Sequence, residues 1–184
     1  MRMEKDKRVE ELNLLTHILT LASAKEPGEA SRALLSRFGS FSAVFEAAAA
    51  ELEKTPGISH NTALLIRLFP QLTRRILLDK HPLPKRVNQA GFDQYLLGYY
   101  FGRTAESLLV FAAGKDGKIL SRTELEGQAE EIIFTRLHRL LDFAVSSGAA
   151  ALVIAHNHPG GFAIPSGEDY EATERLYKAL QAVD

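Results

Sequence analysis

The sequence predicts a small all-α domain followed by an α/β domain, and three observations support this. Apolar residues recur at helical spacing through the first 80 positions. After position 91, strand and helix patterns alternate instead. Between them, Asp79–Gly91 contains two prolines and little apolar periodicity, which is typical of a linker. We therefore expect a helical domain at residues 1–80, a linker at 81–91 and a second domain at 92–184.

The N-terminal part reads as a series of helices. The first helix has an apolar stripe and ends at Glu26-Pro27-Gly28. Further short apolar segments follow, and Ser40 is placed to cap the N-terminus of a helix over Phe41–Ala50. A basic, leucine-rich segment then runs to Leu78, and Pro70 should kink it or begin a new helix. The stripe of the first helix consists of Val9, Leu12, Leu15, Ile18, Leu19 and Ala22.

The second part begins with a predicted β-hairpin. Leu108–Ala113 has the apolar character of a buried strand, Gly114–Gly117 has the composition of a turn, and Lys118–Arg122 follows as a second strand. A helical stripe comes next and ends at Gly148. The stripe consists of Ile132, Ile133, Leu137, Leu140, Leu141, Ala144 and Val145.

The last two predicted elements are a strand and a helix. Ala149–Ala155 is apolar at every position, which predicts a strand covered on both faces at the centre of a sheet. After a loop, Ser166 opens a final helix that runs to about Ala182.

Composition excludes several classes of protein. Cysteine is absent, so disulfide scaffolds, thiolate zinc fingers, cysteine-ligated clusters and cysteine nucleophiles are excluded. Any metal must be held by His, Asp or Glu. The longest apolar runs fall well short of the ~18 residues of a membrane span. The charged N-terminus lacks the apolar core of a secretory signal, which makes the cytoplasm the default location.

Charge is unevenly distributed along the chain. Residues 1–86 hold 14 Lys and Arg against 10 Asp and Glu, whereas residues 87–184 hold 8 against 13. This asymmetry suggests two regions with different partners, and a basic N-terminal region is compatible with nucleic-acid contact as well as with an ordinary solvated surface.

The segment after the last predicted strand carries the residues with the clearest chemistry. His156 and His158 are two positions apart, so in an extended chain both imidazoles point the same way. Pro159 and the glycines after it turn the chain, and Asp169 follows in the first turn of the next helix. Two imidazoles and one carboxylate can hold a divalent ion and leave one position for water, which is the composition of a catalytic zinc site.

Each part of this pattern also has a purely structural interpretation. A His-x-His pair is common in loops, the glycines could form a simple turn, and Ser166 with Asp169 matches a helix capping box. The coincidence of all of them at the carboxyl end of a strand favours the metal site. The remaining histidines lack such neighbours and are expected on the surface or in the core: His17, His60, His81 and His138.

The complete pattern resembles a known family. His-x-His followed by seven residues, Ser, two residues and Asp resembles the signature of the JAB/MPN metalloprotease domains, also called JAMM. The HNHP form with a P-S-x-x-D helix start resembles the bacterial RadC family in particular. The resemblance covers nearly the whole chain, because Leu34–Ser40 and Pro56-Gly57-Ile58 are similar to the helix-hairpin-helix region that precedes the metal domain in that family.

The resemblance implies both a fold and a site. The fold is a JAB/MPN-like mixed sheet flanked by helices, and because related proteins continue beyond the position of Asp184, the sheet of this chain is expected to be incomplete through truncation or divergence. In the implied site, Zn²⁺ is bound by the two histidines and the aspartate, and two further residues act in catalysis. Glu106, at the start of the first strand, is the general base, and Ser166 donates a hydrogen bond to the oxyanion. Seen from the residues alone, an acid at that position is usually an ordinary exposed side chain. The three metal ligands are His156, His158 and Asp169.

Three departures from the family pattern stand out. Gly160 replaces a serine in the His-Pro-Ser-Gly segment, Thr135-Arg136-Leu137 stands where members tend to carry Pro-Arg-Glu, and Ser59 replaces a second glycine of the hairpin. The last change weakens the expectation of phosphate binding by that hairpin. Two other acids, Glu168 and Asp184, do not occupy matching positions.

The sequence leaves three functional hypotheses. The leading one is a zinc-dependent metallohydrolase of peptidase or isopeptidase type that acts on a peptide or isopeptide substrate. The second is a DNA-associated, repair-type factor that binds nucleic acid through residues 1–80 and carries the metal domain as an accessory. The third is a metal-free interaction module, against which the intact His/His/Ser/Asp set argues. No membrane partner is expected.

Overall fold

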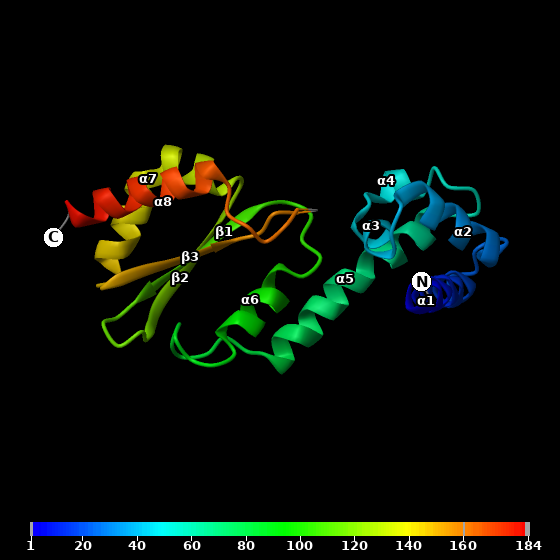
Figure 1. The fold of residues 1–184 in the computed structure, drawn as a ribbon, viewed down its shortest axis with the longest axis horizontal. Helices are drawn as coiled ribbons and strands as arrows, with labels where there is room; N and C mark the ends of the chain where they lie inside the picture. Colours follow the sequence, from blue (N-terminus) through cyan, green and yellow to red (C-terminus); the bar gives the residue numbers. More distant parts are fainter. Residues whose placement is uncertain (1, 160, 183–184) are drawn as a thin grey trace. The chain divides into compact units, whose positions relative to one another are not determined.

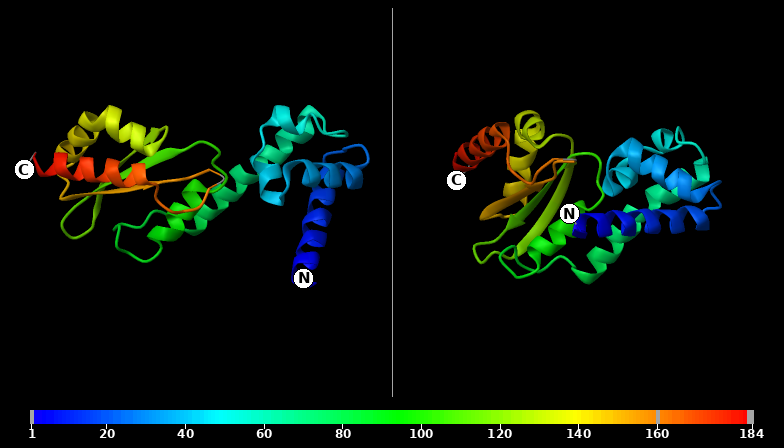
Figure 2. Two further views of the ribbon diagram at one scale, coloured as in Figure 1. Left: turned by 45° about the horizontal axis from the view of Figure 1, so that its top comes forward. Right: turned by 45° about the vertical axis from the view of Figure 1, so that its right-hand side comes forward.

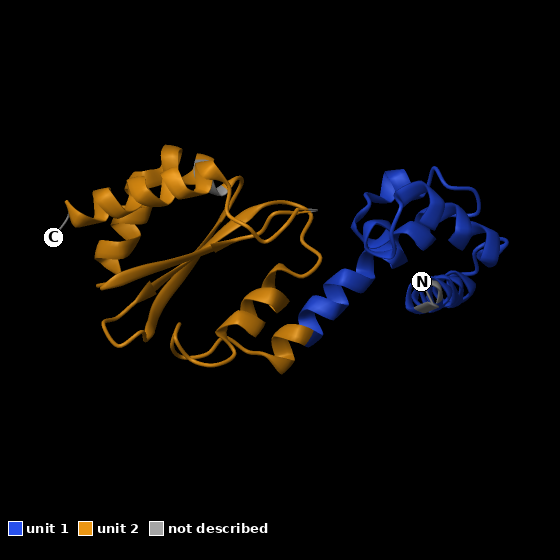
Figure 3. Ribbon diagram, in the orientation of Figure 1, with its two compact units in different colours: residues 1–76 blue, residues 77–184 orange. Residues whose placement is uncertain are grey.

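The computed structural model describes residues 2–159 and 161–182, apart from the side chains at positions 2, 5, 129 and 130. Gly160 and Asp184, both considered in the sequence, therefore lie outside the described residues. The chain divides into two compact units, residues 1–76 and 77–184 (Figure 3). Among the helices described, none has the length and apolar character that crossing a membrane requires.

The first unit is built from helices, as the sequence predicts. They are α1 (Arg2–Leu21), α2 (Pro27–Phe38), α3 (Phe41–Glu46), α4 (Ala49–Leu52) and most of α5 (His60–Lys80). They enclose an apolar core that includes Leu15, Leu19, Leu34, Val44, Leu52 and Ile66. The predicted cap is confirmed, because the Ser40 hydroxyl accepts a hydrogen bond from the amide of Ala43 at 3.1 Å. No new helix begins at Pro70, which lies buried inside the continuous α5.

The predicted hairpin between α4 and α5 has a backbone that requires glycine. Gly57 has a φ of +85°, and a Cβ there would lie 2.8 Å from the carbonyl oxygen of Lys25. Gly39, which follows α2, has a similar φ of +80° but open space around it. Both positions therefore disfavour other residues, and at Gly57 the close approach of the chain adds a second constraint.

These two glycines form a matched pair for a stability measurement. Gly39→Ala should lower the free energy of unfolding of the first unit by about 1 kcal/mol, through the strained φ alone. Gly57→Ala should cost about 1–3 kcal/mol more, because the backbone of Lys25 must shift. Urea unfolding of the two variants measures the difference. Equal losses would show that the contact with Lys25 is unimportant.

The second unit is an α/β domain, so the predicted fold class is confirmed. Its elements are α6 (Phe92–Tyr100), β1 (Ser107–Ala113), β2 (Ile119–Glu126), α7 (Ala129–Ser146), β3 (Ala151–His156) and α8 (Gly167–Gln181). The strands form a sheet of order β2-β1-β3, and both pairings within the described residues are antiparallel. The turn between β1 and β2 closes at residues 114–118, where the Gly114 amide donates to the Lys118 carbonyl at 2.9 Å.

Helices cover both faces of this sheet (Figures 1 and 2). Side chains alternate along β1, so Leu108 and Val110 pack with residues of α7 and α8. Leu109 and Phe111 point to the opposite face and pack with α6. All seven residues of β1 are buried, which makes this strand the centre of the domain.

Two expectations about the sheet need correction. The all-apolar run that includes β3 does not form the central strand, because β3 lies at the edge of the described sheet and most of its residues are only half-buried. An apolar run indicates burial but does not say which of two such strands is paired on both sides. The second strand also extends to Glu126, four residues beyond the predicted Arg122.

The segment predicted as a linker is placed within the second unit. Arg86 forms an isolated β-bridge with Lys118, and the Val87 amide donates to the Gly117 carbonyl at 2.9 Å. The division between the two units falls earlier, within α5. Within the Thr135-Arg136-Leu137 segment, Arg136 has non-helical angles (φ −120°, ψ 22°) inside α7.

Candidate metal centre

The end of β3 brings the two predicted histidine ligands together. His156 is the last residue of β3 and pairs directly with Leu108 of β1, so its side chain lies on the α7 and α8 face. His158 follows in the loop, and its Nε2 lies 2.8 Å from the Nε2 of His156. Both side chains are mostly buried, with 17% and 29% exposed. Their ring nitrogens therefore point to one location.

Asp169 reaches the same location from the first turn of α8. One carboxylate oxygen, Oδ1, lies 3.1 Å from His156 Nε2, and the other, Oδ2, lies 3.5 Å from His158 Nε2. The aspartate side chain is 6% exposed. One ligand atom from each of the three residues fits within 4.8 Å of the others, and in the described part of the chain this is the group that could hold a metal ion.

At the start of α8, the two carboxylate oxygens of Asp169 have different surroundings. Ser166 donates to Oδ2 from its amide at 2.7 Å and from its hydroxyl at 2.8 Å, and the Asp169 amide donates back to the Ser166 hydroxyl. This is the predicted capping box. The remaining oxygen, Oδ1, is buried and has no hydrogen-bond partner among the described residues.

The charge state of the site suits a cation. Burial raises the pKa of Asp169, but the hydrogen bonds from Ser166 and the nearby His156 and His158 outweigh burial and hold that pKa below its ordinary value. Oδ1 lies 3.1 Å from His156 Nε2 but accepts no hydrogen bond among the described residues, so it is available to a bound ion. The three residues thus fit a divalent metal, with two imidazole nitrogens and Oδ1 as donors.

Glu106, the predicted base, lies directly before β1. It is half-buried, and its carbonyl oxygen accepts the amide of Gly127 at 3.1 Å. Because Leu108 pairs with His156, a residue two positions before Leu108 falls on the same face of the sheet as the cluster.

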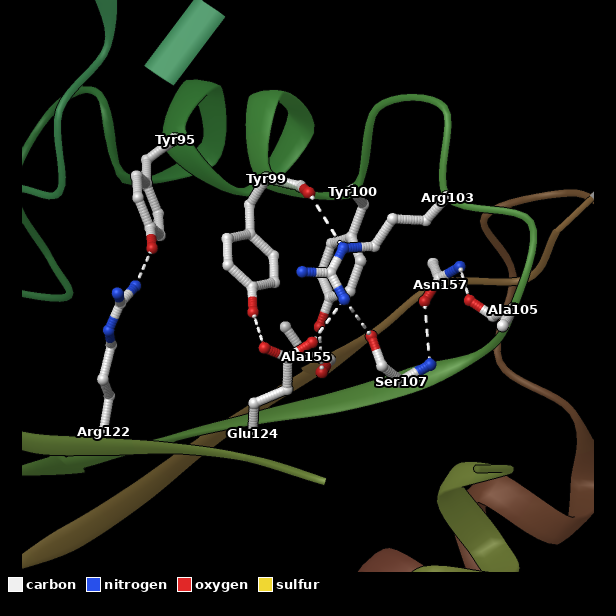
Figure 4. Close-up of polar contacts among 10 residues, drawn as sticks. All are labelled: Tyr95, Tyr99, Tyr100, Arg103, Ala105, Ser107, Arg122, Glu124, Ala155 and Asn157. Carbon is white, nitrogen blue, oxygen red and sulfur yellow. Dashed lines mark hydrogen bonds and ion pairs between the residues drawn. The ribbon is translucent and has the colours of Figure 1, made fainter. Parts of the chain in front are cut away.

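A polar framework on the α6 side of the sheet was not predicted (Figure 4). Arg103 forms an ion pair with Glu124, stacks over the ring of Tyr99 at 4.3 Å and donates to the hydroxyl of Ser107 at 3.2 Å. Tyr99 donates to the same Glu124, and burial together with this hydrogen bond raises the pKa of Tyr99 to about 12. The two contacts with Glu124 join residues more than 20 positions apart in sequence, so no short-range signal reveals them.

Two further side chains of that framework make contacts with β3 and with the start of β1. The Tyr100 hydroxyl donates to the Ala155 carbonyl at 2.7 Å. Asn157, between the two histidines, contacts the backbone on both sides of Glu106. The sequence did offer a signal for Asn157. In an extended His-x-His segment the middle side chain points in a different direction from the two histidines, so the pattern indicates other partners for Asn157.

Other candidate residues are not part of the cluster. Glu168 is exposed at the start of α8, and His60 is paired with Glu53 at 2.8 Å. In the hairpin of the first unit, the Ser59 hydroxyl accepts the amide of Thr62 at 3.2 Å, so it caps α5 itself. Nucleic-acid binding by residues 1–80 stays a prediction.

A helix-covered sheet whose last described strand ends in a His-His-Asp cluster belongs to the JAB class of domains. Residues 88–184 match the sequence profile described as the RadC-like JAB domain. The chain is a member of the RadC family of JAB-domain proteins, as the sequence pattern indicates.

Curated relatives support the same assignment along most of the chain. A UPF0758 protein of Chromobacterium violaceum is 31% identical over 160 residues, covering 85% of this chain and 70% of that protein. A UPF0758 protein of Burkholderia cenocepacia is 27% identical over 172 residues, covering 91% of this chain and 67% of the relative. One of Cupriavidus pinatubonensis is 27% identical over 166 residues, covering 89% and 72%.

Proposed function

We propose that the protein is a zinc-dependent hydrolase of amide bonds, of peptidase or isopeptidase type. The observation that carries this proposal is that two imidazole nitrogens and a buried carboxylate oxygen lie within 4.8 Å of one another, and that this oxygen accepts no hydrogen bond among the described residues. Two histidines and one carboxylate are the ligand set of catalytic zinc sites, which keep a fourth position open. His156, His158 and Asp169 would hold the ion. When bound, zinc supplies a water whose pKa is lowered toward ~7.

Two side chains of the chain itself would complete the reaction. Glu106, on the face of the sheet that carries the cluster, would accept a proton from the attacking water and pass it to the leaving amine. Ser166 holds Oδ2 of Asp169 and so orients this ligand. To act also as the oxyanion donor, its hydroxyl must turn from Asp169 toward the substrate.

A groove beside the histidine pair offers space for an extended substrate. It lies on the α6 side of the histidine pair, has a volume of about 560 Å³ and is bordered by Leu97 of α6, by Phe101 and by His156 and His158. Leu97 is 72% exposed and Phe101 is 44% exposed. Apolar walls next to a polar ligand cluster are typical of sites that bind a chain and place one bond at the reactive centre.

Metal analysis combined with a cleavage screen tests the function. Full-length protein should bind about one zinc per chain. In a broad panel of peptide and isopeptide-linked substrates, some should be cleaved, and a chelator should abolish that cleavage until zinc is restored. Protein that binds no zinc, or cleavage that the chelator leaves unchanged, would reject the proposal.

A further inference from the structure

Asn157, the residue between the two histidines, binds the backbone of the segment that carries Glu106. Its Oδ1 accepts the amide hydrogen of Ser107, with N and O 3.0 Å apart. Its Nδ2 donates to the carbonyl oxygen of Ala105, also at 3.0 Å. Figure 4 shows both hydrogen bonds, one on each side of position 106. A single side chain therefore fixes the main chain immediately before and after Glu106.

The bonds of Asn157 replace strand pairing at this point. The last pair of the ladder between β1 and β3 is Leu108 with His156, and the next pair would be Ser107 with Asn157. Instead, β3 ends at His156 and the Asn157 side chain takes the Ser107 amide. The segment of Glu106 is thus tied to the residue that separates the two metal ligands.

A second contact holds the same segment from the α6 side. Arg103 donates to the hydroxyl of Ser107, and its ion pair with Glu124 fixes the guanidinium. Ser107 itself is 2% exposed. Its backbone is consequently held by Asn157 and its side chain by Arg103, so position 106 has little freedom to move relative to β1.

From these contacts we propose that Asn157 is a positioning residue, which holds the Glu106 carboxylate at a fixed distance from the His156–His158–Asp169 cluster. This inference rests on the proposed function, in which Glu106 is the base. The role requires one donor and one acceptor on a short side chain, and an amide supplies both. Aspartate supplies acceptors alone, and alanine supplies neither. A displacement of about 1 Å at a reacting group can cost about 100-fold in rate.

The first measurement is amide hydrogen exchange at Ser107 in the full chain. In Asn157→Ala the Ser107 amide should exchange about tenfold faster, the change expected for loss of one hydrogen bond. Asn157→Asp keeps the acceptor, so the Ser107 amide should stay protected while the Ala105 carbonyl loses its donor. Asn13→Ala, at an exposed position of α1, is the matched control and should change neither. Unchanged exchange at Ser107 in Asn157→Ala would overturn the inference.

The second measurement reports the position of Glu106 without any substrate. With cobalt(II) as the probe ion and ¹³C-labelled glutamate, paramagnetic relaxation of the Glu106 carboxyl carbon falls with the sixth power of its distance from the ion. Both Asn157 variants should weaken this relaxation, while cobalt affinity changes by less than the roughly 10-fold typical of a lost ligand-orienting residue. If Asn157 has a purely structural role, its variants should lose stability while the relaxation of the Glu106 carbon stays unchanged. That result would overturn the proposal.

The two measurements separate the inference from the function on which it rests. If the wild-type chain binds no cobalt or zinc, the proposed function fails, and Ser107 exchange still decides whether Asn157 holds the segment. If metal binds and Ser107 responds but the Glu106 carbon keeps its relaxation, the positioning role is rejected while the metal site stands.

Discussion

Glu106→Gln should lower the rate of zinc-dependent hydrolysis by about 100-fold or more and leave bound zinc unchanged. Glutamine keeps the size and much of the hydrogen bonding of glutamate but cannot accept a proton, and general base catalysis is worth about 10²–10⁴-fold. The effect should fall on kcat, because the carboxylate acts on the water and not on the metal. Steady-state kinetics with a substrate from the cleavage screen, together with zinc analysis of the same samples, measure both quantities.

Glu168→Gln is the matched control for this experiment. Glu168 is adjacent to Asp169 but exposed in the first turn of α8, so the substitution removes an equal charge near the site without removing the base. It should retain close to wild-type activity. If Glu106→Gln is as active as Glu168→Gln, or if it loses zinc, then Glu106 is not the base that we propose.

Replacing either histidine of the cluster with alanine should nearly abolish zinc binding. His156 and His158 each place a ring nitrogen at the shared location, so either loss leaves two ligands. The fall in zinc affinity should exceed the roughly 10–100-fold produced when an outer-shell partner is lost. Equilibrium dialysis of His156→Ala and His158→Ala against buffered zinc measures it.

His138→Ala provides the control for nonspecific loss of a histidine. His138 is exposed on α7 and is not part of the cluster, so its removal should leave one zinc per chain. Circular dichroism of each variant establishes that the fold is retained. Zinc content that is unchanged in both cluster variants would remove these residues as ligands.

The ligand cluster was predictable because its geometry is largely local. His156 and His158 are related by strand alternation, and Ser166 and Asp169 by the first turn of a helix, so spacing alone indicates how each pair is arranged. Spacing does not show that the two pairs meet. The glycine-containing loop between them indicated that the chain turns back and brings them together. For the same reason the Ser40 cap and the β1–β2 turn were predicted correctly.

The features that escaped prediction depend on partners distant in sequence. The apolar pattern marked both β1 and β3 as buried strands, but only pairing decides that β1 lies between the other two. Pro70 was a candidate to begin a new helix, but it lies buried within α5. The hydrogen bond between Asn157 and Ser107 joins residues 50 positions apart, so short-range patterns do not indicate it.

The two oxygens of the Asp169 carboxylate have different partners, and this difference has a thermodynamic consequence. Oδ2 completes the N-terminal cap of α8, and Oδ1 accepts no hydrogen bond among the described residues. In the proposed site, the same Asp169 side chain caps α8 and binds the ion. Formation of the first helical turn and binding of the metal are therefore linked equilibria. An ion that requires this carboxylate in its capped conformation stabilises the folded unit by mass action, by about 2.7 kcal/mol at a free concentration 100 times its Kd. By reciprocity, fraying of the first turn of α8 releases the ion, so the affinity of the metal site and the stability of the helix rise and fall together.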